Sequence, residues 1–218
     1  NQDVLYRFKD KEEPTIFLDP NIFSKDGTTS LGGLSFSKDG KKLAYAISEG
    51  GSDWRKIILM DAVSKENLED TIIDVKFSGM SWKGDEGIFY SSYEKPKGSE
   101  LSAKTDQHRL FYHKLGTAQK NDPIIFGDKV KRRYINGSVT EDGKYLVISA
   151  SESTSGNELY IKDLGNPKNE LKCLVNNFEN DHSVVFSKGD LLYVSTHLDA
   201  PNKKIVTFEF DKFIIVFG

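Results

Sequence analysis

The stretch Phe36-Ser-Lys-Asp-Gly40, followed by Lys41-Lys-Leu-Ala-Tyr45, decides the fold because a close variant of it returns three times along the chain. Each copy has an aromatic or apolar residue, a short polar turn with Gly and Asp, and then an alternating apolar strand. The other copies are Trp82-Lys-Gly-Asp-Glu-Gly87 with residues 88–90, Val139-Thr-Glu-Asp-Gly143 with residues 144–148, and Phe186-Ser-Lys-Gly-Asp190 with residues 191–194. Since Gly tolerates the positive φ of a tight turn, each copy predicts a β-hairpin.

The copies recur with a period near 50, because residues 36, 82, 139 and 186 lie 46, 57 and 47 residues apart. A third strand is predicted after each hairpin, at residues 56–61, 109–114, 158–163 and 204–210. A shorter fourth strand is predicted at residues 15–19, 71–74, 123–126 and 171–175. Four short strands in each period, with no helical period, are typical of β-propeller blades, whereas a sandwich or barrel would not need this repeated order. The predicted fold is therefore all-β, a partial β-propeller of about four four-stranded blades.

We predict one partial propeller domain over residues 1–210, with blade repeats centred near 36–75, 82–126, 139–175 and 186–210. The last segment, Asp211-Lys-Phe-Ile-Ile-Val-Phe-Gly218, is an atypical apolar tail. An apolar run at an open sheet edge favours aggregation because nothing pairs its backbone groups. We interpret the tail as a sign of truncation or of a shifted reading frame.

Charge and hydropathy exclude two classes of partner. The chain has 30 Lys and Arg against 33 Asp and Glu, a net charge of −3, so it lacks the positive excess that binds nucleic acid or an anionic membrane. Its longest apolar run, residues 213–217, is far shorter than the roughly 20 residues that cross a bilayer. The opening residues also lack a basic and apolar targeting segment, which indicates a mature or excised chain.

Residues for catalysis or metal binding are not found in the sequence. No serine stands in a Gly-x-Ser-x-Gly motif, and the nearest approach, Gly33-Leu-Ser-Phe-Ser37, lacks the second Gly. His108 and His113 are five residues apart, which places them on opposite faces of a strand. We therefore predict no catalytic residue, no metal site and no cofactor in this chain.

Seven stretches, in order, resemble the propeller of the prolyl oligopeptidase family, the prolyl endopeptidases, and the bacterial members most strongly. They are Phe17-Leu-Asp-Pro-Asn21, Gly50-Gly-Ser-Asp-Trp54, Val75-Lys-Phe-Ser-Gly79 with Trp82, Phe89-Tyr-Ser-Ser-Tyr93, Tyr112-His-Lys-Leu-Gly-Thr117, Asn157-Glu-Leu-Tyr-Ile-Lys-Asp-Leu164 and Asp199-Ala-Pro-Asn202. The resemblance implies a parent serine peptidase with an α/β-hydrolase domain, whose Ser, Asp and His triad is covered by a seven-bladed propeller. Such enzymes cut short peptides after proline.

At about 50 residues a blade, this chain would hold about four of the seven blades and none of the hydrolase domain. The resemblance then implies a segment that gates substrate access and is inactive alone. Its partners would be short proline-containing peptides and the missing hydrolase domain, in the cytoplasm or the periplasm. The alternative is a free-standing propeller that binds a peptide or protein.

The resemblance also implies three substrate-binding residues. Phe77 matches a phenylalanine that in the family contacts substrate upstream of proline, although it could equally be an aromatic residue of a blade core. Tyr134 stands where animal members have methionine, and Ser153 falls near their cysteine.

Overall fold

Each predicted hairpin forms the first half of a four-stranded antiparallel sheet. The computed structural model describes residues 2–96, 105–166, 168–212 and 214–216. Its four sheets of four strands, here called blades 1 to 4, each keep their strands in chain order. Blade 1 is β3 (Thr29–Phe36), β4 (Lys42–Glu49), β5 (Trp54–Asp61) and β6 (Asn67–Lys76); blade 2 is β7 (Ser81–Lys83), β8 (Gly87–Ser92), β9 (Arg109–Lys114) and β10 (Ile124–Phe126); blade 3 is β11 (Tyr134–Val139), β12 (Tyr145–Ser151), β13 (Glu158–Asp163) and β14 (Lys172–Val175); blade 4 is β15 (His182–Lys188), β16 (Leu191–Thr196), β17 (Lys204–Glu209) and β18 (Ile214–Val216).

The third strands of blades 2 and 3 have the predicted limits, residues 109–114 and 158–163. The prediction for the fourth strand of blade 1 was too short, because β6 runs over Asn67–Lys76 and not only over residues 71–74. Its polar first part still pairs with β5, as Met60 opposite Asn67 shows, since the ladder uses backbone groups. The polar residues 67–70 are thus part of the strand.

The segment before blade 1 forms a separate antiparallel pair, β1 (Leu5–Arg7) and β2 (Thr15–Leu18). A short 3₁₀ helix, η1 (Pro20–Ile22), then leads into blade 1. Asp19 stabilises its start, because its carboxylate accepts a hydrogen bond from the backbone N–H of Asn21 at 2.9 Å.

Apolar side chains pack between successive sheets and not within any one of them. Along β12, Leu146, Ile148 and Ala150 face blade 2, whereas Tyr145 and Val147 face blade 4. Successive residues of a strand point to opposite faces, so both faces of a middle strand are buried. The same alternation occurs in β4 and β8. Face-to-face packing of this kind is the stacking of propeller blades.

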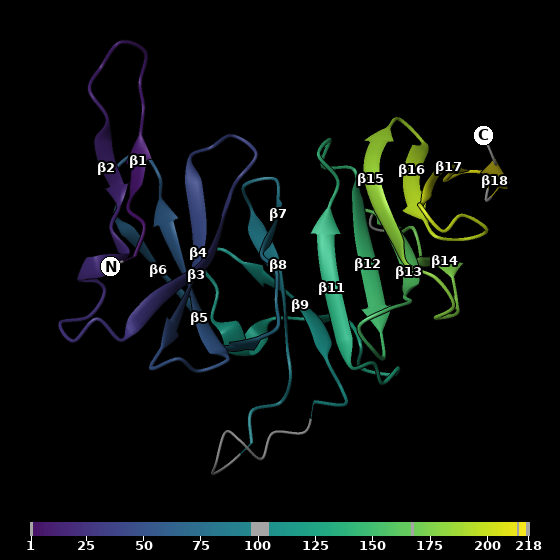
Figure 1. Cartoon of the computed structure of the whole chain (residues 1–218), viewed down its shortest axis with the longest axis horizontal. Helices are drawn as coiled ribbons and strands as arrows, with labels where there is room; N and C mark the ends of the chain where they lie inside the picture. The colour runs from purple at the N-terminus through teal and green to yellow at the C-terminus, as the bar shows by residue number, and fades with distance from the viewer. Residues whose placement is uncertain (1, 97–104, 167, 213, 217–218) are drawn as a thin grey trace.

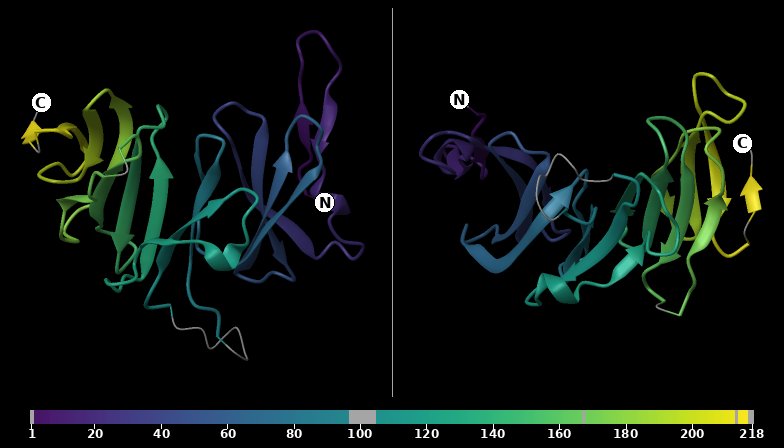
Figure 2. Two further views of the ribbon diagram at one scale, coloured as in Figure 1. Left: turned by 180° about the vertical axis from the view of Figure 1, so that it is seen from behind. Right: turned by 90° about the horizontal axis from the view of Figure 1, so that it is seen from below.

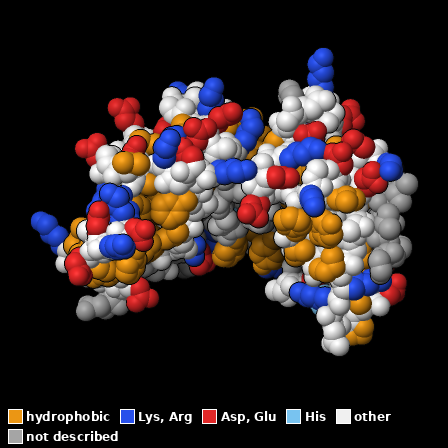
Figure 3. Space-filling view, turned by 90° about the horizontal axis from the view of Figure 1, so that it is seen from above, with side chains coloured by type: hydrophobic (Ala, Val, Ile, Leu, Met, Phe, Trp, Pro, Cys, Tyr) orange, Lys and Arg blue, Asp and Glu red, His pale blue; other side chains and the backbone are white. Residues whose placement is uncertain are grey.

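The four blades follow one another as an open arc (Figure 1), and the views from behind and from below show β1–β2 and blade 4 at its opposite ends (Figure 2). The first strand of each blade is an edge strand, and β3 and β15 carry exposed apolar side chains. The space-filling view shows a hollow between the two halves of the molecule with apolar side chains on both sides of it (Figure 3).

Part of the apolar tail belongs to blade 4. Strand β18 pairs antiparallel with β17, with Ile215 opposite Phe208. Phe213, Phe217 and Gly218 lie outside the described residues, and the domain limit at residue 210 stays a prediction. The described part of the chain contains no helix with the length and apolar character that a membrane crossing requires.

Candidate functional site

Three aromatic rings from separate segments meet at one end of blades 2 and 3. Phe77 lies in the connection from β6 to β7, Tyr93 follows β8, and Tyr134 begins β11. The ring of Phe77 is 6.2 Å from that of Tyr93, edge to face, and 6.1 Å from that of Tyr134. We call these three residues the aromatic cluster. The end of the blades at which β11 begins lies at the bottom of the view in Figure 1.

Phe77 stands in an unusual conformation for a bulky residue. Its φ is +53°, in the left-handed region, and its side chain is 50% exposed. Such a conformation costs about 1–3 kcal/mol and persists only where the surroundings impose it. The exposed ring, together with this backbone, is what a ligand contact would show; a core aromatic would be buried.

Tyr93 is the buried member of the aromatic cluster. Its hydroxyl donates a hydrogen bond of 2.5 Å to the carbonyl oxygen of Arg133. Burial raises the pKa of Tyr93, so the phenol stays protonated and remains a donor. The Arg133 guanidinium in turn lies 5.5 Å from the ring centre of Tyr134.

Lysine side chains extend the cluster toward blade 1. Lys76 places its ammonium 5.1 Å from the ring centre of Phe77 and 5.3 Å from that of Trp54, distances typical of cation–π contacts. Lys76 also pairs with Asp53 at 3.5 Å. Trp54 also lines a pocket of about 500 Å³, together with Asp74 and Lys95.

The Gly50-Gly-Ser-Asp-Trp54 motif forms the corner that holds this tryptophan. Gly50 and Gly51 have φ of +58° and +73°, and Ser52 accepts a hydrogen bond from the backbone N–H of Trp54 at 3.1 Å. By this geometry the motif is a structural corner.

Of the three residues expected to bind substrate, the structure brings two together. Phe77 and Tyr134 are neighbours in the aromatic cluster. Ser153 lies in the loop after β12, two residues beyond Ser151, which pairs with Tyr134. Its hydroxyl donates to the carbonyl oxygen of Ser155 at 2.9 Å, within its own loop. A substrate contact of Ser153 stays a prediction.

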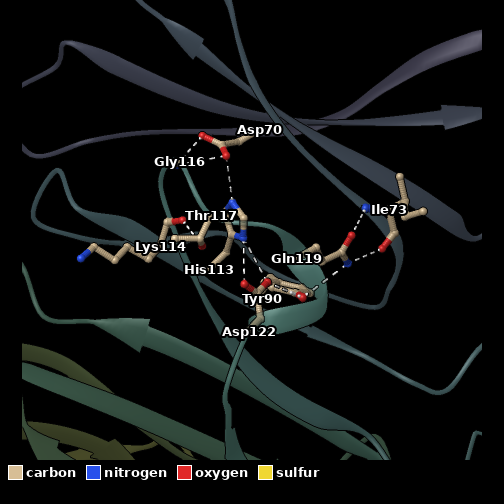
Figure 4. A network of polar contacts seen from close by, with 9 residues as sticks. All are labelled: Asp70, Ile73, Tyr90, His113, Lys114, Gly116, Thr117, Gln119 and Asp122. Atoms are coloured by element: carbon tan, nitrogen blue, oxygen red, sulfur yellow. Dashed lines mark hydrogen bonds and ion pairs between the residues drawn. The ribbon is translucent and has the colours of Figure 1, made fainter.

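A cluster of polar residues also joins blades 1 and 2 (Figure 4). We call it the histidine clasp; it consists of Asp70, Tyr90, His113 and Asp122. His113, from β9, is 1% exposed, and its Nδ1 lies 2.9 Å from the carboxylate of Asp122. Its Nε2 faces Asp70 of β6 at 3.6 Å. The hydroxyl of Tyr90 donates to the second oxygen of Asp122 at 3.0 Å.

The clasp is an ion pair and not a catalytic dyad. Burial by itself would lower the pKa of His113, but the hydrogen bond and charge of Asp122, together with Asp70, leave that pKa raised. Both ring nitrogens point at carboxylates, so neither is placed to take a proton from a hydroxyl nucleophile. His108 lies in a different network, so the two histidines do not share a site.

A family comparison assigns the fold. The model of the prolyl oligopeptidase N-terminal β-propeller domain matches residues 1–214. The chain belongs to this family. It is 55% identical over 207 residues to a prolyl endopeptidase of Elizabethkingia meningoseptica, and 34% identical over 247 residues to prolyl oligopeptidase A of Amanita bisporigera. These alignments cover 94% and 97% of this chain but only 29% and 32% of the relatives.

Solved structures agree with the assignment. A structure from a study of two prolyl endopeptidases and of their inter-domain dynamics superposes with a TM-score of 0.88 at 30% identity, over 100% of this chain and 32% of that one. Prolyl oligopeptidase B of Galerina marginata, bound to a 35-residue hydrolysis and macrocyclization substrate, gives 0.87 at 28% identity, over 98% and 34%. The chain thus spans about a third of the length of its relatives, within their propeller.

Sequence reasoning missed Tyr93 and Lys76 as parts of the site. Tyr93 ends one of the stretches that resemble the family and Lys76 stands beside Phe77 in another, but neither stretch marks them as site residues. The signal available was the position of both at strand ends, where propellers place their binding loops. Which strand ends meet depends on blade packing, and no local pattern encodes that.

Proposed function

We propose that this chain is the substrate-gating propeller segment of a serine endopeptidase that cleaves short peptides after proline. The segment holds no catalytic residue of its own and acts together with an α/β-hydrolase domain. Family membership supports this role, since the relatives bear the names prolyl endopeptidase and prolyl oligopeptidase. The contribution of the segment would be steric and positional: it excludes folded proteins and water and lines part of the peptide pocket.

One observation carries the proposed peptide contact: Phe77 is a half-exposed aromatic ring in a left-handed backbone, against Tyr134 of another blade. Aromatic rings of this kind supply apolar contact area at low entropic cost. The ammonium of Lys76 lies against the rings of both Phe77 and Trp54 and pairs with Asp53, so it would hold these rings in place for the peptide.

Reconstitution tests the proposed activity. Residues 2–210 replace the homologous segment of the Elizabethkingia meningoseptica enzyme, and turnover of a chromogenic Phe-Gly-Pro peptide is measured. We expect turnover by the hybrid and none by the 218-residue chain alone. A folded hybrid without activity contradicts the proposal, and turnover by the chain alone would make it an independent hydrolase.

Phe77→Ala in that hybrid is expected to raise KM for Phe-Gly-Pro about tenfold, because loss of a ring contact costs on the order of 1.5 kcal/mol. The matched control is Phe186→Ala. Phe186 is 49% exposed and also packs against a tyrosine, but on blade 4. An equal KM for both variants refutes the assignment of Phe77.

A free-standing binding module remains the second candidate, because the aromatic cluster is complete within this one chain. It predicts that the chain alone binds a Phe-Gly-Pro peptide in a fluorescence titration and that added hydrolase domain forms no complex. A tight complex with the hydrolase domain would decide for the gating segment.

A further inference from the structure

His108 is buried next to the aromatic cluster, and its two ring nitrogens form hydrogen bonds to two separate backbone segments. The residue is 0% exposed. Its Nε2 lies 2.9 Å from the carbonyl oxygen of Lys76, and its Nδ1 lies 2.9 Å from the backbone N–H of Ile135. A carbonyl oxygen can only accept and an N–H can only donate, so the ring is neutral, with its proton on Nε2.

The two partners of this ring are the sequence neighbours of Phe77, which is half-exposed, and of Tyr134, which is partly buried. Lys76 precedes Phe77, and Ile135 follows Tyr134. The ring of Tyr93 stacks on the imidazole, 4.3 Å between centres and 20° between planes. The backbone N–H of His108 also donates to the carbonyl oxygen of Arg132, at 2.8 Å. One imidazole thus connects the loop that carries Phe77 to the strand that carries Tyr134.

We propose that His108 is a positioning residue for peptide binding: it fixes the separation of Phe77 and Tyr134, and so the fit of the residue upstream of proline. This inference rests on the proposed function of the aromatic cluster. Misplacing a binding group by about 1 Å can cost up to two orders of magnitude in catalytic efficiency, so a rigid support has a measurable effect.

The chemistry of the position favours this role over simple core filling. An apolar side chain could fill the same space, whereas a buried histidine brings two ring nitrogens that both need hydrogen-bond partners. Burial lowers the pKa of His108 to about 4, which keeps the ring neutral and Nδ1 an acceptor at neutral pH. The surrounding charges are otherwise engaged, since Lys76 pairs with Asp53, Arg132 with Glu158, and Arg133 lies over Tyr134. The titratable phenol beside the ring belongs to Tyr93, which stacks on the imidazole.

The test uses the hybrid enzyme and two peptides, Phe-Gly-Pro and the truncated Gly-Pro. His108→Phe keeps a ring on Tyr93 but removes both hydrogen bonds; we expect KM for Phe-Gly-Pro to rise about tenfold at unchanged kcat. The KM for Gly-Pro, which lacks the upstream residue, should not change. His108→Gln keeps a donor and an acceptor and should stay within about threefold of the unsubstituted hybrid.

His113→Gln is the control, because it alters a buried histidine that does not touch the aromatic cluster. It should leave both KM values unchanged. If His108→Phe does not fold, His108→Asn replaces it, since the shorter amide reaches only one partner and should raise KM more than His108→Gln.

The outcomes separate the two proposals. A rise in KM with Phe77→Ala but not with the His108 variants overturns the positioning role alone. No rise with any of these variants overturns the site itself. Equal effects of His108→Phe on both peptides would show general damage, which also refutes positioning.

Discussion

Asp122→Ala is expected to destabilise the chain by about 3–5 kcal/mol, the usual cost of removing one partner of a buried ion pair. The carboxylate of Asp122 is 2% exposed and accepts hydrogen bonds from both the Nδ1 of His113 and the hydroxyl of Tyr90. Without it, the buried imidazolium keeps only Asp70, at 3.6 Å, and the buried phenol of Tyr90 loses its acceptor at the junction of blades 1 and 2. Urea unfolding of the 218-residue chain at pH 6 measures the loss.

Asp128→Ala serves as control, because this exposed aspartate follows the same blade and has a side chain in solvent. Its effect should stay within about 0.5 kcal/mol. A loss below about 1 kcal/mol for Asp122→Ala would mean that the histidine clasp contributes little.

The pH dependence of the same clasp has a definite sign. The pKa of His113 is raised in the folded chain, so its stabilisation is fully present below the unfolded pKa, about 6.5, and is lost as pH rises through the folded value. His108 acts oppositely: its folded pKa of about 4 lies below 6.5, so it costs stability as pH falls between these values. In His113→Gln the decline of unfolding free energy on the alkaline side should disappear, while the acidic decline stays.

The blades could be predicted because their signals are local. The turn Asp39-Gly40 and its counterparts mark the hairpins, and the alternation along each second strand marks two buried faces. The extension of β6 to Asn67 could not be predicted, since polar residues pair there through backbone groups alone. The sequence pattern therefore predicts a strand where apolar side chains alternate, and fails where only backbone hydrogen bonds hold the strand.

The candidate site could not be predicted from local patterns, because Phe77 and Tyr134 are 57 residues apart in sequence and meet only in the folded chain. Family resemblance pointed to both, but spacing alone did not. His108 has no local signal at all, since an isolated histidine before a strand looks the same whether it supports a site or faces solvent. Its role depends on which backbone groups blade packing brings to its ring.

Gly156→Ala is the second substitution with a large expected effect. Gly156 is buried at φ +73°, and a Cβ there would lie 1.8 Å from the carbonyl oxygen of Phe178. Because the obstacle is backbone, it cannot rotate away as a side chain would, and the two segments must separate. We expect a loss of about 3–5 kcal/mol in unfolding free energy, from overpacking and backbone strain together.

Gly143→Ala isolates the strain, since Gly143 has φ +78° and open space where a Cβ would stand. That variant should lose only about 1 kcal/mol. The difference matters beyond stability, because Gly156 lies two residues before Glu158, whose carboxylate holds Arg132 by hydrogen bonds of 2.7 and 2.8 Å. Arg132 accepts the backbone N–H of His108, so displacement of this loop should also loosen the aromatic cluster. Equal losses for the two alanine variants in urea unfolding would refute the steric argument.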